Sequence, residues 1–456
     1  MSMEIMKADV AVIGGGPGGM AAAVSAARQG AKVILVERNG YLGGLLGSGL
    51  PLLAYWDMKK RPIYGGFAQE IVDRLQAMGG SEGPAYCPFH LSTTMVHPFY
   101  SRIICFQMVK ECGIELLMHC ELTDVEVKDG KILSVTVTGK GTPIKIEASV
   151  FIDGTGDGDV GYMAGAEYEK GQDKTGVLQP PTLMFHLDGI HFEEFYDYLE
   201  QHPEELPYEL GLPHIREGYN AEFFRNNPSH VFFGLNTMIK KLQEAGDCPV
   251  KRDTVIYIKQ PIEGQVTVNT IRILNFDGSN IHDLSHGEMD AHLQIMPIIE
   301  MFRKHIPGFQ DCYLASVNST IGVRESRRIM GMKKLCYQDA LDGVVPEDTI
   351  ALGNYFIDIH SGDGAKTFTK TIKEPYGFPY GITVSKDIDG LMMTGRCVSV
   401  DAITFGSSRI MGPCMAIGEG AGVGAALAVQ KGISPKDVPV DEIRKVLLSR
   451  GAILHV

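Results

Sequence analysis

The sequence predicts an α/β fold in which a parallel-sheet domain, built from both ends of the chain, carries an inserted α+β domain. Three observations support this. An apolar strand over 8–13 runs into a glycine loop and a helix of small residues. Glycine-dense segments return after residue 376, and the middle of the chain is richer in proline and aromatic residues. The length of 456 residues leaves room for two or three domains.

The first glycine loop has GxGxxG spacing, formed by Gly14, Gly16 and Gly19. In this pattern the first glycine allows a tight turn, the second admits a pyrophosphate, and the third lets helix and strand pack closely. The following helix is expected over 20–29, and its N-terminus attracts the phosphate charge. A second strand over 33–36 ends in Glu37, which can accept hydrogen bonds from a ribose diol. The order of these parts predicts a dinucleotide site.

Regular elements are expected along the rest of the first third. The segment 40–49 is too glycine-rich for one, and its backbone can lie against a flat cofactor. Helices are expected over 67–78 and 98–112, a strand over 114–119, an antiparallel meander over 123–127, 132–138 and 143–146, and a strand over 149–153.

The change of composition sets the expected domain limits. Residues 1–170 and 371–456 form the nucleotide domain, and residues 171–370 form a substrate or cap domain. The inserted part is expected to contain strands over 182–187, 254–258 and 265–273 and helices over 192–202 and 290–305.

Two later glycine clusters narrow down which cofactor the chain binds. Residues 156–161 also have GxGxxG spacing, but two aspartates lie in that loop and disfavour a pyrophosphate. A turn beneath the first cofactor is the better interpretation. A strand over 391–394 precedes Gly395, and a helix over 413–429 has a face of small residues that suits contact with a sheet or a flat ring. Glycine-rich backbone from both ends of the chain favours a cofactor with an extended ring system.

The bulk composition narrows the class of protein. A net charge of −13 and a pI near 5.6 argue against nucleic acid or an anionic membrane as partner. The nine cysteines form no CxxC pair, which argues against a redox disulfide and a zinc ribbon. His90 and His97 lack the spacing of a metal site, so none is expected. Without a visible signal peptide or membrane-spanning run, a cytoplasmic protein is expected.

Six motifs together carry a family resemblance. They are GGGPGG at 14–19 with Glu37, DGTGD at 153–157, RESRR at 324–328, YGFPY at 376–380, GRCVS at 395–399 and GSSRIM at 406–411. The chain resembles the bacterial FAD-dependent oxidoreductases of the glutathione reductase-type FAD fold, and is distantly similar to fumarate reductases and ketosteroid dehydrogenases. The resemblance covers nearly the whole chain and is weakest over 171–310. It implies a Rossmann-like FAD-binding domain.

The resemblance also implies where FAD lies. The adenosine pocket is expected around 14–37, and the isoalloxazine near 43–47, 395–396 and the start of the last glycine-rich helix. The expected cofactor residues are Gly14, Gly16, Pro17, Gly18, Gly19, Glu37, Arg38, Gly43, Gly44, Leu45, Gly47, Gly154, Thr155, Gly156, Asp157, Gly395, Arg396, Met411, Gly412 and Met415.

The implied reaction is hydride transfer between flavin N5 and a small organic substrate, with reoxidation by a separate acceptor. Two alternatives stay open: a flavin-binding protein without its own turnover, such as a sensor or subunit, and an NAD-dependent dehydrogenase. The expected partners are the substrate and an unidentified electron acceptor or donor, and a homo-oligomer is left open.

His360 is the first catalytic candidate. It ends an expected strand beside a glycine loop, its ordinary pKa near 6.5 suits proton transfer, and Asp358 lies on the same strand face. The alternative is a surface histidine. Tyr380, like Tyr376, is expected either to present a hydroxyl acid or to pack against the flavin.

Arginines are the remaining candidates. Arg324, Arg327 and Arg328 are expected on one helix face, where they can clamp a carboxylate. The alternative is an internal salt bridge to Glu325 or to the flavin domain. Arg409 is expected near the flavin helix, where it holds either substrate charge or the flavin.

Overall fold

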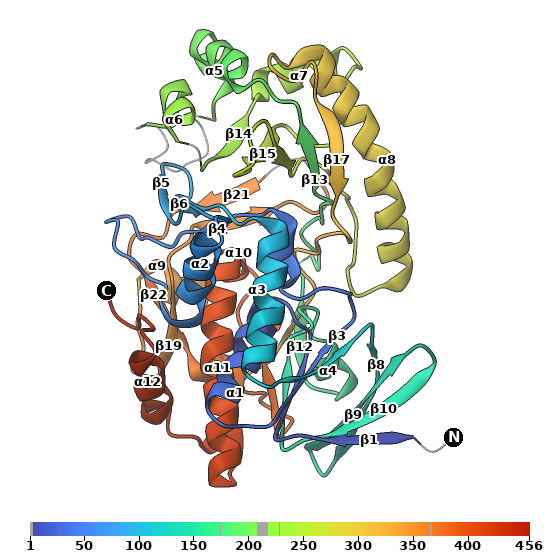
Figure 1. Cartoon of the computed structure of the whole chain (residues 1–456), viewed down its shortest axis with the longest axis vertical. Coiled ribbons are helices and arrows are strands. Elements are labelled where there is room, and N and C mark those ends of the chain that lie inside the picture. Colours follow the sequence, from blue (N-terminus) through green and yellow to red (C-terminus); the bar gives the residue numbers. More distant parts are fainter. Residues whose placement is uncertain (1–2, 174, 208–217, 228, 365–366) are drawn as a thin grey trace.

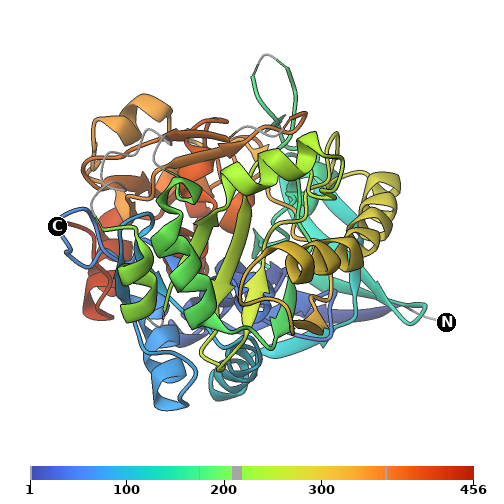
Figure 2. The same cartoon turned by 90° about the horizontal axis from the view of Figure 1, so that it is seen from above.

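A five-stranded parallel sheet forms the centre of the lower lobe (Figure 1). The computed structural model describes residues 3–173, 175–207, 218–227, 229–364 and 367–456. The strand order is β23 (Leu391–Met393), β11 (Val150–Asp153), β2 (Val10–Ile13), β3 (Val33–Glu37) and β7 (Glu115–Met118). Because β23 pairs in parallel with β11, both ends of the chain build one sheet. The two termini lie on opposite sides of the molecule (Figure 2).

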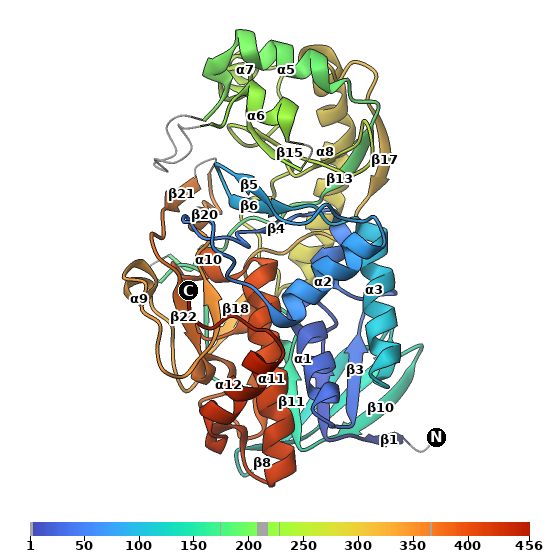
Figure 3. The same ribbon diagram turned by 60° about the vertical axis from the view of Figure 1, so that its left-hand side comes forward.

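Two glycine-containing helices lie side by side against this sheet (Figure 3). They are α1 (Pro17–Arg28) and α11 (Met411–Lys431). A Cβ atom at Gly418 would lie 2.2 Å from the carbonyl oxygen of Gly18, and one at Gly422 would lie 2.2 Å from that of Ala22. At Gly418 and Gly422 the small-residue face of α11 therefore packs against the backbone of α1, a contact that the sequence does not predict, and α11 also contacts β2, β11 and β23 of the sheet.

Both helices begin earlier than expected. α1 starts at Pro17 because the fixed φ of proline suits the first helical position, and Gly16 supplies the N-cap. α11 starts at Met411. Among the described residues, α11 is the single helix long and apolar enough to cross a membrane, and most of it is buried within the molecule.

The predicted meander is present in the lower lobe. It consists of β8 (Glu121–Lys128), β9 (Lys131–Gly139) and β10 (Thr142–Glu147), paired antiparallel. β1 (Glu4–Lys7) joins it in parallel beside β10, which the sequence does not predict. In 40–49, where no regular element is expected, the structure has a short 3₁₀ helix, η1 (Gly44–Ser48).

The upper lobe is a mixed unit with its own core. Its antiparallel sheet runs β14 (Val231–Gly234), β15 (Val255–Lys259), β16 (Val266–Val268), β13 (Phe185–Asp188) and β17 (Tyr313–Val317). The helices are α5 (Phe192–Gln201), α6 (Ala221–Asn226), α7 (Asn236–Glu244) and α8 (Ile281–His305). α8 begins nine residues before the predicted start at 290, because the side chain of Asn280 caps it by accepting from the backbone N–H groups of His282 and Asp283.

The chain returns to the lower lobe before residue 370. β12 (Tyr168–Lys170) pairs with β18 (Arg327–Ile329), and Ile329 and Ile357 pack in one core with Ala11 and Phe151 of the parallel sheet. Residues from about 327 onward, which the sequence assigns to the inserted domain, therefore pack with the nucleotide domain.

The remaining elements connect these units. They are β4 (Leu52–Leu53), β5 (Ala85–Cys87), β6 (Leu91–Thr94), β19 (Thr349–Gly353), β20 (Ile357–His360), β21 (Thr367–Lys370), β22 (Tyr376–Pro379), α2 (Gly66–Ala77), α3 (Pro98–Glu111), α4 (Asp159–Met163), α9 (Tyr337–Leu341), α10 (Phe405–Ser408) and α12 (Val440–Ser449).

A buried histidine in the upper lobe makes stability depend on pH. His230 is fully buried beside the rings of Tyr196, Phe224 and Tyr257, and burial lowers its pKa to about 3. An unfolded histidine titrates near 6.5, so between pH 6.5 and 3 the unfolded chain binds the extra proton. The contribution of His230 is therefore complete above pH 6.5. Below that pH it falls by at most about 1.4 kcal/mol per pH unit.

Urea unfolding at pH 7.5 and pH 5.0 checks this expectation. His230→Gln should lose less stability than the wild type on acidification, because the buried neutral ring is gone. His282→Gln, at an exposed position on α8, should keep the wild-type pH dependence. An unchanged pH dependence in His230→Gln would contradict the assignment.

Candidate functional site

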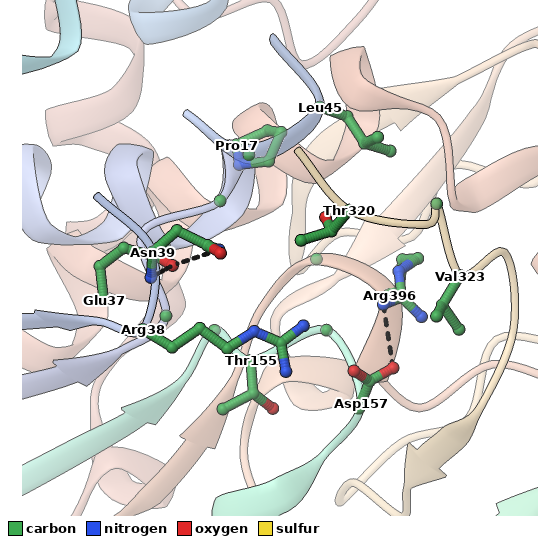
Figure 4. A pocket seen from close by; sticks show the side chains of 18 of the residues that line it. Pro17, Glu37, Arg38, Asn39, Leu45, Thr155, Asp157, Thr320, Val323 and Arg396 are labelled. Atoms are coloured by element: carbon green, nitrogen blue, oxygen red, sulfur yellow. Dashed lines mark hydrogen bonds and ion pairs between the residues drawn. The ribbon is translucent and has the colours of Figure 1, made fainter. Parts of the chain in front are cut away.

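A deep cleft lies at the carboxyl ends of the central strands, where ligands bind in open α/β sheets. Segments far apart in the sequence meet there, and Figure 4 shows side chains from several of them facing one space. The lining segments are the glycine loop at 14–19, residues 36–39, 44–48, 120–122, 154–157, 318–323 and 395–396, and the start of α11.

The three motif glycines are required for different reasons. Gly14 has a φ of +105°, and a Cβ atom there would lie 2.3 Å from the carbonyl oxygen of Gly154. A Cβ atom at Gly19 would lie 1.8 Å from the carbonyl oxygen of Gly14. Apart from its chain neighbours, no atom of the described residues lies within 4 Å of a Cβ atom built on Gly16. Gly14 and Gly19 therefore serve the packing of the loop, whereas Gly16 faces open space at the N-terminus of α1, as a pyrophosphate site requires.

Glu37 is held rigidly at the end of β3. Its Oε2 accepts a hydrogen bond from the backbone N–H of Gly15 at 2.8 Å. Its Oε1 accepts from the backbone N–H and the side-chain amide of Asn39 at 2.8 and 2.7 Å. The carboxylate is thus oriented by the glycine loop itself, in the position where the motif places a ribose acceptor. Asn39, which sequence reasoning missed, is its second anchor.

The second GxGxxG sequence forms a wall of the same cleft. Asp153 accepts hydrogen bonds from Thr155 N–H and Oγ–H at 3.1 and 2.6 Å and from Gly161 N–H at 3.0 Å, which tightens the turn. Helix α4 after it has only five residues. The loop lies against Gly14 of the first glycine loop, a position compatible with the predicted turn beneath the cofactor.

Four arginines, Arg38, Arg102, Arg396 and Arg409, bring positive charge to the cleft. Arg396 Nη2 lies 3.0 Å from Asp157 Oδ1, which also accepts from Ser326 Oγ at 2.7 Å (Figure 4). Arg38 extends over Thr155 (Figure 4). Arg102, which the sequence does not indicate, donates to the Gly47 carbonyl at 2.8 Å. Cationic side chains on these walls favour an anionic ligand such as a pyrophosphate.

Most of the cofactor residues expected from the sequence line the cleft, but three do not. A Cβ atom at Gly43 would meet Cys105, and one at Gly412 would meet the ring of Tyr64, so both glycines allow close packing. Met415 is fully buried in the core. Sequence reasoning also missed Tyr41, Arg102, Thr182, Met184, Asn318–Val323 and Cys414.

A second cavity continues from the first between the lobes. The residues that line both are Leu45, Thr182, Met184, Gly322, Val323, Arg396, Arg409 and Met411. Its walls are largely apolar and come from both lobes, among them Phe89, Phe233, Ile256, Tyr355 and Phe356. Its polar side includes Arg324, Asp358, His360 and Arg409. This combination of an apolar wall and a few polar groups is typical of a small-molecule site.

His360 lines this second cavity at the end of β20, as the sequence predicts. Its Nε2 lies 3.3 Å from Asp358 Oδ2, and its Nδ1 lies 3.1 Å from Thr367 Oγ. Burial lowers its pKa to about 3, so the expected value near 6.5 is wrong and the ring is neutral at neutral pH. Both ring nitrogens thus have partners, Asp358 and Thr367, and the catalytic role of His360 stays a prediction.

Asp358 is the ionised centre of this group. Its Oδ2 also lies 3.0 Å from Arg409 Nη2, and its backbone carbonyl accepts from the same nitrogen at 3.1 Å. Burial alone would raise the pKa of Asp358, but His360, Arg409 and Arg324 outweigh burial and hold it well below its usual range. Arg409 lies just before α11, near which the sequence places it, and it lines both cavities.

The predicted helical face of arginines is wrong. Arg327 and Arg328 lie on strand β18, and Arg324 lies in the preceding loop. Arg328 Nη1 lies 2.7 Å from Glu325 Oε1, the internal salt bridge that was the alternative interpretation, and Arg327 pairs with Asp159 at 2.9 Å. Arg324 alone of the three lines the second cavity.

The tyrosines do not support the predicted acid role. Tyr380 is buried against Gly424 of α11, and its hydroxyl donates to the Pro435 carbonyl at 3.0 Å. Tyr376 is fully buried and donates to Ser407 Oγ at 2.8 Å. Neither lines a cavity, so both pack the core.

These residues fit FAD. The open space at Gly16 admits a pyrophosphate, the Glu37 carboxylate suits a ribose, and the cleft continues to Leu45, Arg396 and Met411, where the flavin ring is expected. When bound, FAD supplies two-electron chemistry at the flavin. The protein itself would orient the FAD in the cleft, and it provides a largely apolar second cavity beside the expected flavin position.

Comparisons with known proteins agree with this fit. The family model for FAD dependent oxidoreductases matches residues 9–447. Thiamine thiazole synthase of Pyrococcus horikoshii is 26% identical over 162 residues, which cover 34% of this chain and 59% of that protein. The enzyme of the same name from Aeropyrum pernix is 28% identical over 165 residues, covering 33% and 55%. The chain thus spans somewhat under two thirds of the length of these curated relatives.

Solved structures show the same architecture. The structure of p-nitrophenol 4-monooxygenase PnpA from Pseudomonas putida superposes with a TM-score of 0.50 at 10% identity, covering 99% of this chain and 87% of that one. At such low identity the likeness concerns the fold alone. Because the family model spans nearly the whole chain, and because the cleft fits FAD, this protein belongs to the FAD-dependent oxidoreductase family.

Proposed function

We propose that this FAD-dependent enzyme transfers a hydride between flavin N5 and a small organic substrate bound in the second cavity. One observation carries the proposal: the two cavities share a wall at Leu45, Arg396, Arg409 and Met411, so a molecule in the second cavity lies beside the expected flavin position. Its aromatic and aliphatic walls provide an apolar surface for the body of such a substrate. A separate acceptor would reoxidise the reduced flavin.

The test uses an analogue that transfers hydride but not single electrons. The protein is loaded with reduced 5-deazaFAD carrying deuterium at C5 and incubated anaerobically with a small-molecule cell extract. We expect deuterium to appear on carbon in one product, detected as a mass increase. Natural FAD that reoxidises with one-electron acceptors, while the deaza analogue labels nothing, would contradict hydride transfer. If the bound flavin neither transfers deuterium nor reduces one-electron acceptors, the result would favour a flavin-binding protein without turnover.

A matched pair of variants locates the substrate. Ile256 lines the second cavity only, so Ile256→Trp should fill it and abolish labelling while FAD stays bound. Ile262→Trp adds the same side chain at an exposed position of the upper lobe and should behave as the wild type. Full labelling by Ile256→Trp would exclude the second cavity as the substrate site.

A further inference from the structure

Four arginines converge around the polar side of the second cavity. This arginine cluster consists of Arg252, Arg272, Arg324 and Arg409, which come from four separate segments. Arg252 donates to the Asn269 carbonyl at 3.2 Å, and the side chain of the same asparagine lies 3.4 Å from Arg324 Nη2. Arg272 and Arg252 are each 2% exposed. The cluster is therefore a built feature of the interior.

A second link joins the cluster to strand β20. Arg272 donates to the carbonyl of Ser361 at 3.1 Å, directly after His360. Arg409 pairs with Asp358, two residues before His360 on the same strand. Arg324 donates to the Pro180 carbonyl, which holds its guanidinium at the cavity wall. Arg324 and Arg409 thus line the cavity, and Arg252 and Arg272 lie close enough to act electrostatically on Arg324.

Within the described part of the chain, fewer buried carboxylates than guanidinium groups lie near Arg252, Arg324 and Arg409. Among the residues that the structure describes, the carboxylates acting on the cluster are Asp358, which is shared with Arg409 and His360, the exposed Asp253, and Glu325, which acts on Arg409. Glu325 is engaged by Arg328. Burial, and then the guanidinium groups of Arg409 and Arg252, hold the pKa of Arg324 well below its ordinary value. An excess of buried cations is costly unless an anion joins them.

Two donors in the cluster also lack a partner within the described part of the chain. The Nε atoms of Arg409 and Arg252 are buried and make no hydrogen bond there. A buried donor without an acceptor costs free energy, and a ligand oxygen can satisfy it. Arg409 is the better placed of the two, because it lines both cavities. The Nε of Arg409, unpartnered among the described residues, and the excess of positive charge therefore lie at the same end of the cavity.

We infer, resting on the proposed function, that the substrate is an organic carboxylate whose charged end is bound by Arg324 and Arg409 and whose apolar body lies against the aromatic wall. Guanidinium groups match the planar carboxylate with paired hydrogen bonds. The wall that receives the apolar body is formed by Phe89, Phe233, Tyr355 and Phe356, together with Leu50 and Leu53. A small hydrophilic dianion would leave these side chains uncovered, so the ligand is amphipathic.

Equilibrium binding to the FAD-loaded protein tests this without turnover. Benzoate and benzamide have the same shape but differ in charge, as do hexanoate and hexanamide. By calorimetric titration we expect at least one carboxylate to bind tenfold or more tightly than its amide, and more tightly than inorganic sulfate. Carboxylates that bind no better than their amides would overturn the inference. Sulfate binding as tightly as the best carboxylate would also overturn it, since the apolar body would then contribute nothing.

Variants assign the effect to the cluster. Arg324→Met should weaken binding of that carboxylate at least tenfold and leave binding of the amide unchanged, and Arg324→Lys should restore part of the loss. Lys251→Met removes an exposed cation of the same lobe and serves as the control. Unchanged carboxylate affinity in both Arg324 variants, each with full FAD content, would overturn the assignment.

Failure of this inference is distinguishable from failure of the proposed function. Carboxylate binding with no deuterium transfer would leave the anion site standing and remove the hydride reaction. Deuterium transfer to a neutral product, with no preference for carboxylates in binding, would support the hydride reaction and remove the anion site.

Discussion

Gly16→Val is expected to abolish FAD binding while the apoprotein remains folded. The reason is that, apart from its chain neighbours, a Cβ atom at Gly16 meets no atom of the described residues within 4 Å, and its backbone φ of −70° is open to any residue. The side chain therefore costs the fold little, but it occupies the space through which the pyrophosphate must approach the N-terminus of α1. We expect FAD affinity to fall at least about a hundredfold, or about 2.7 kcal/mol.

Gly14→Ala provides the contrast. Its Cβ atom would lie 2.3 Å from the Gly154 carbonyl oxygen, and the φ of +105° is unfavourable for alanine, so the apoprotein itself should lose stability. Gly364→Ala, where the nearest atom lies at an ordinary 3.5 Å, is the control for an added methyl group.

The measurements are flavin absorbance per protein after reconstitution and thermal unfolding of the apoprotein. Gly16→Val should unfold at the wild-type temperature but bind little flavin. Gly14→Ala should have both a lower unfolding temperature and a lower flavin content. If Gly16→Val bound FAD normally, the pyrophosphate would not lie at this loop.

Glu325→Leu is expected to destabilise the protein by about 3–5 kcal/mol. Glu325 and Arg328 form an ion pair at 2.7 Å, and their side chains are 0% and 1% exposed. Removal of the carboxylate leaves a buried guanidinium without its counter-charge. Glu325 also accepts a hydrogen bond from the backbone N–H of Gln179, and the side chain of Gln179 accepts one from the backbone N–H of His360. Removal of the Glu325 carboxylate is therefore expected to disturb the wall of the second cavity as well.

Urea unfolding of three proteins checks this expectation. The double variant Glu325→Leu/Arg328→Met should recover much of the loss, because no unpaired charge then remains. Arg225→Met removes an arginine that pairs at the surface with Glu193 and Asp197, and it should cost no more than about 1 kcal/mol. A cost for Glu325→Leu no larger than that of Arg225→Met would show that the buried pair contributes no more than a surface one.

Local patterns predict the nucleotide half of the molecule well. The strands over 10–13 and 33–37, the glycine loop between them and the meander lie close to where the sequence places them. Their determinants are neighbours in the chain: a buried apolar run, a turn that only glycine permits, and alternation of side chains. Glu37 is predictable for the same reason, because the strand that carries it also positions it.

The arginines show why the rest of the site was harder to predict. Spacing of three and four residues in 324–328 is compatible with a helix face, but β18 pairs with β12, a strand far away in the sequence. Pairing between strands that are distant in the sequence cannot be recognised from a pattern of a few consecutive residues. This pairing decides which arginine contacts Glu325 and which one lines the cavity. Tyr380 was misjudged for the same reason, because its partners lie on α11 and at Pro435.

The sequence by itself determined the strand, glycine loop and helix around 14–19, the place of Glu37 beside that loop, and the return of glycine-rich backbone from the end of the chain to the same cleft. These properties depend on local backbone geometry. The tertiary structure decided that 318–323 and Arg102 join the cleft, that His360 is neutral, and that Arg324, Arg409 and Asp358 meet at the second cavity. Burial and charge proximity are properties of the folded chain, since they arise from segments that only packing brings together.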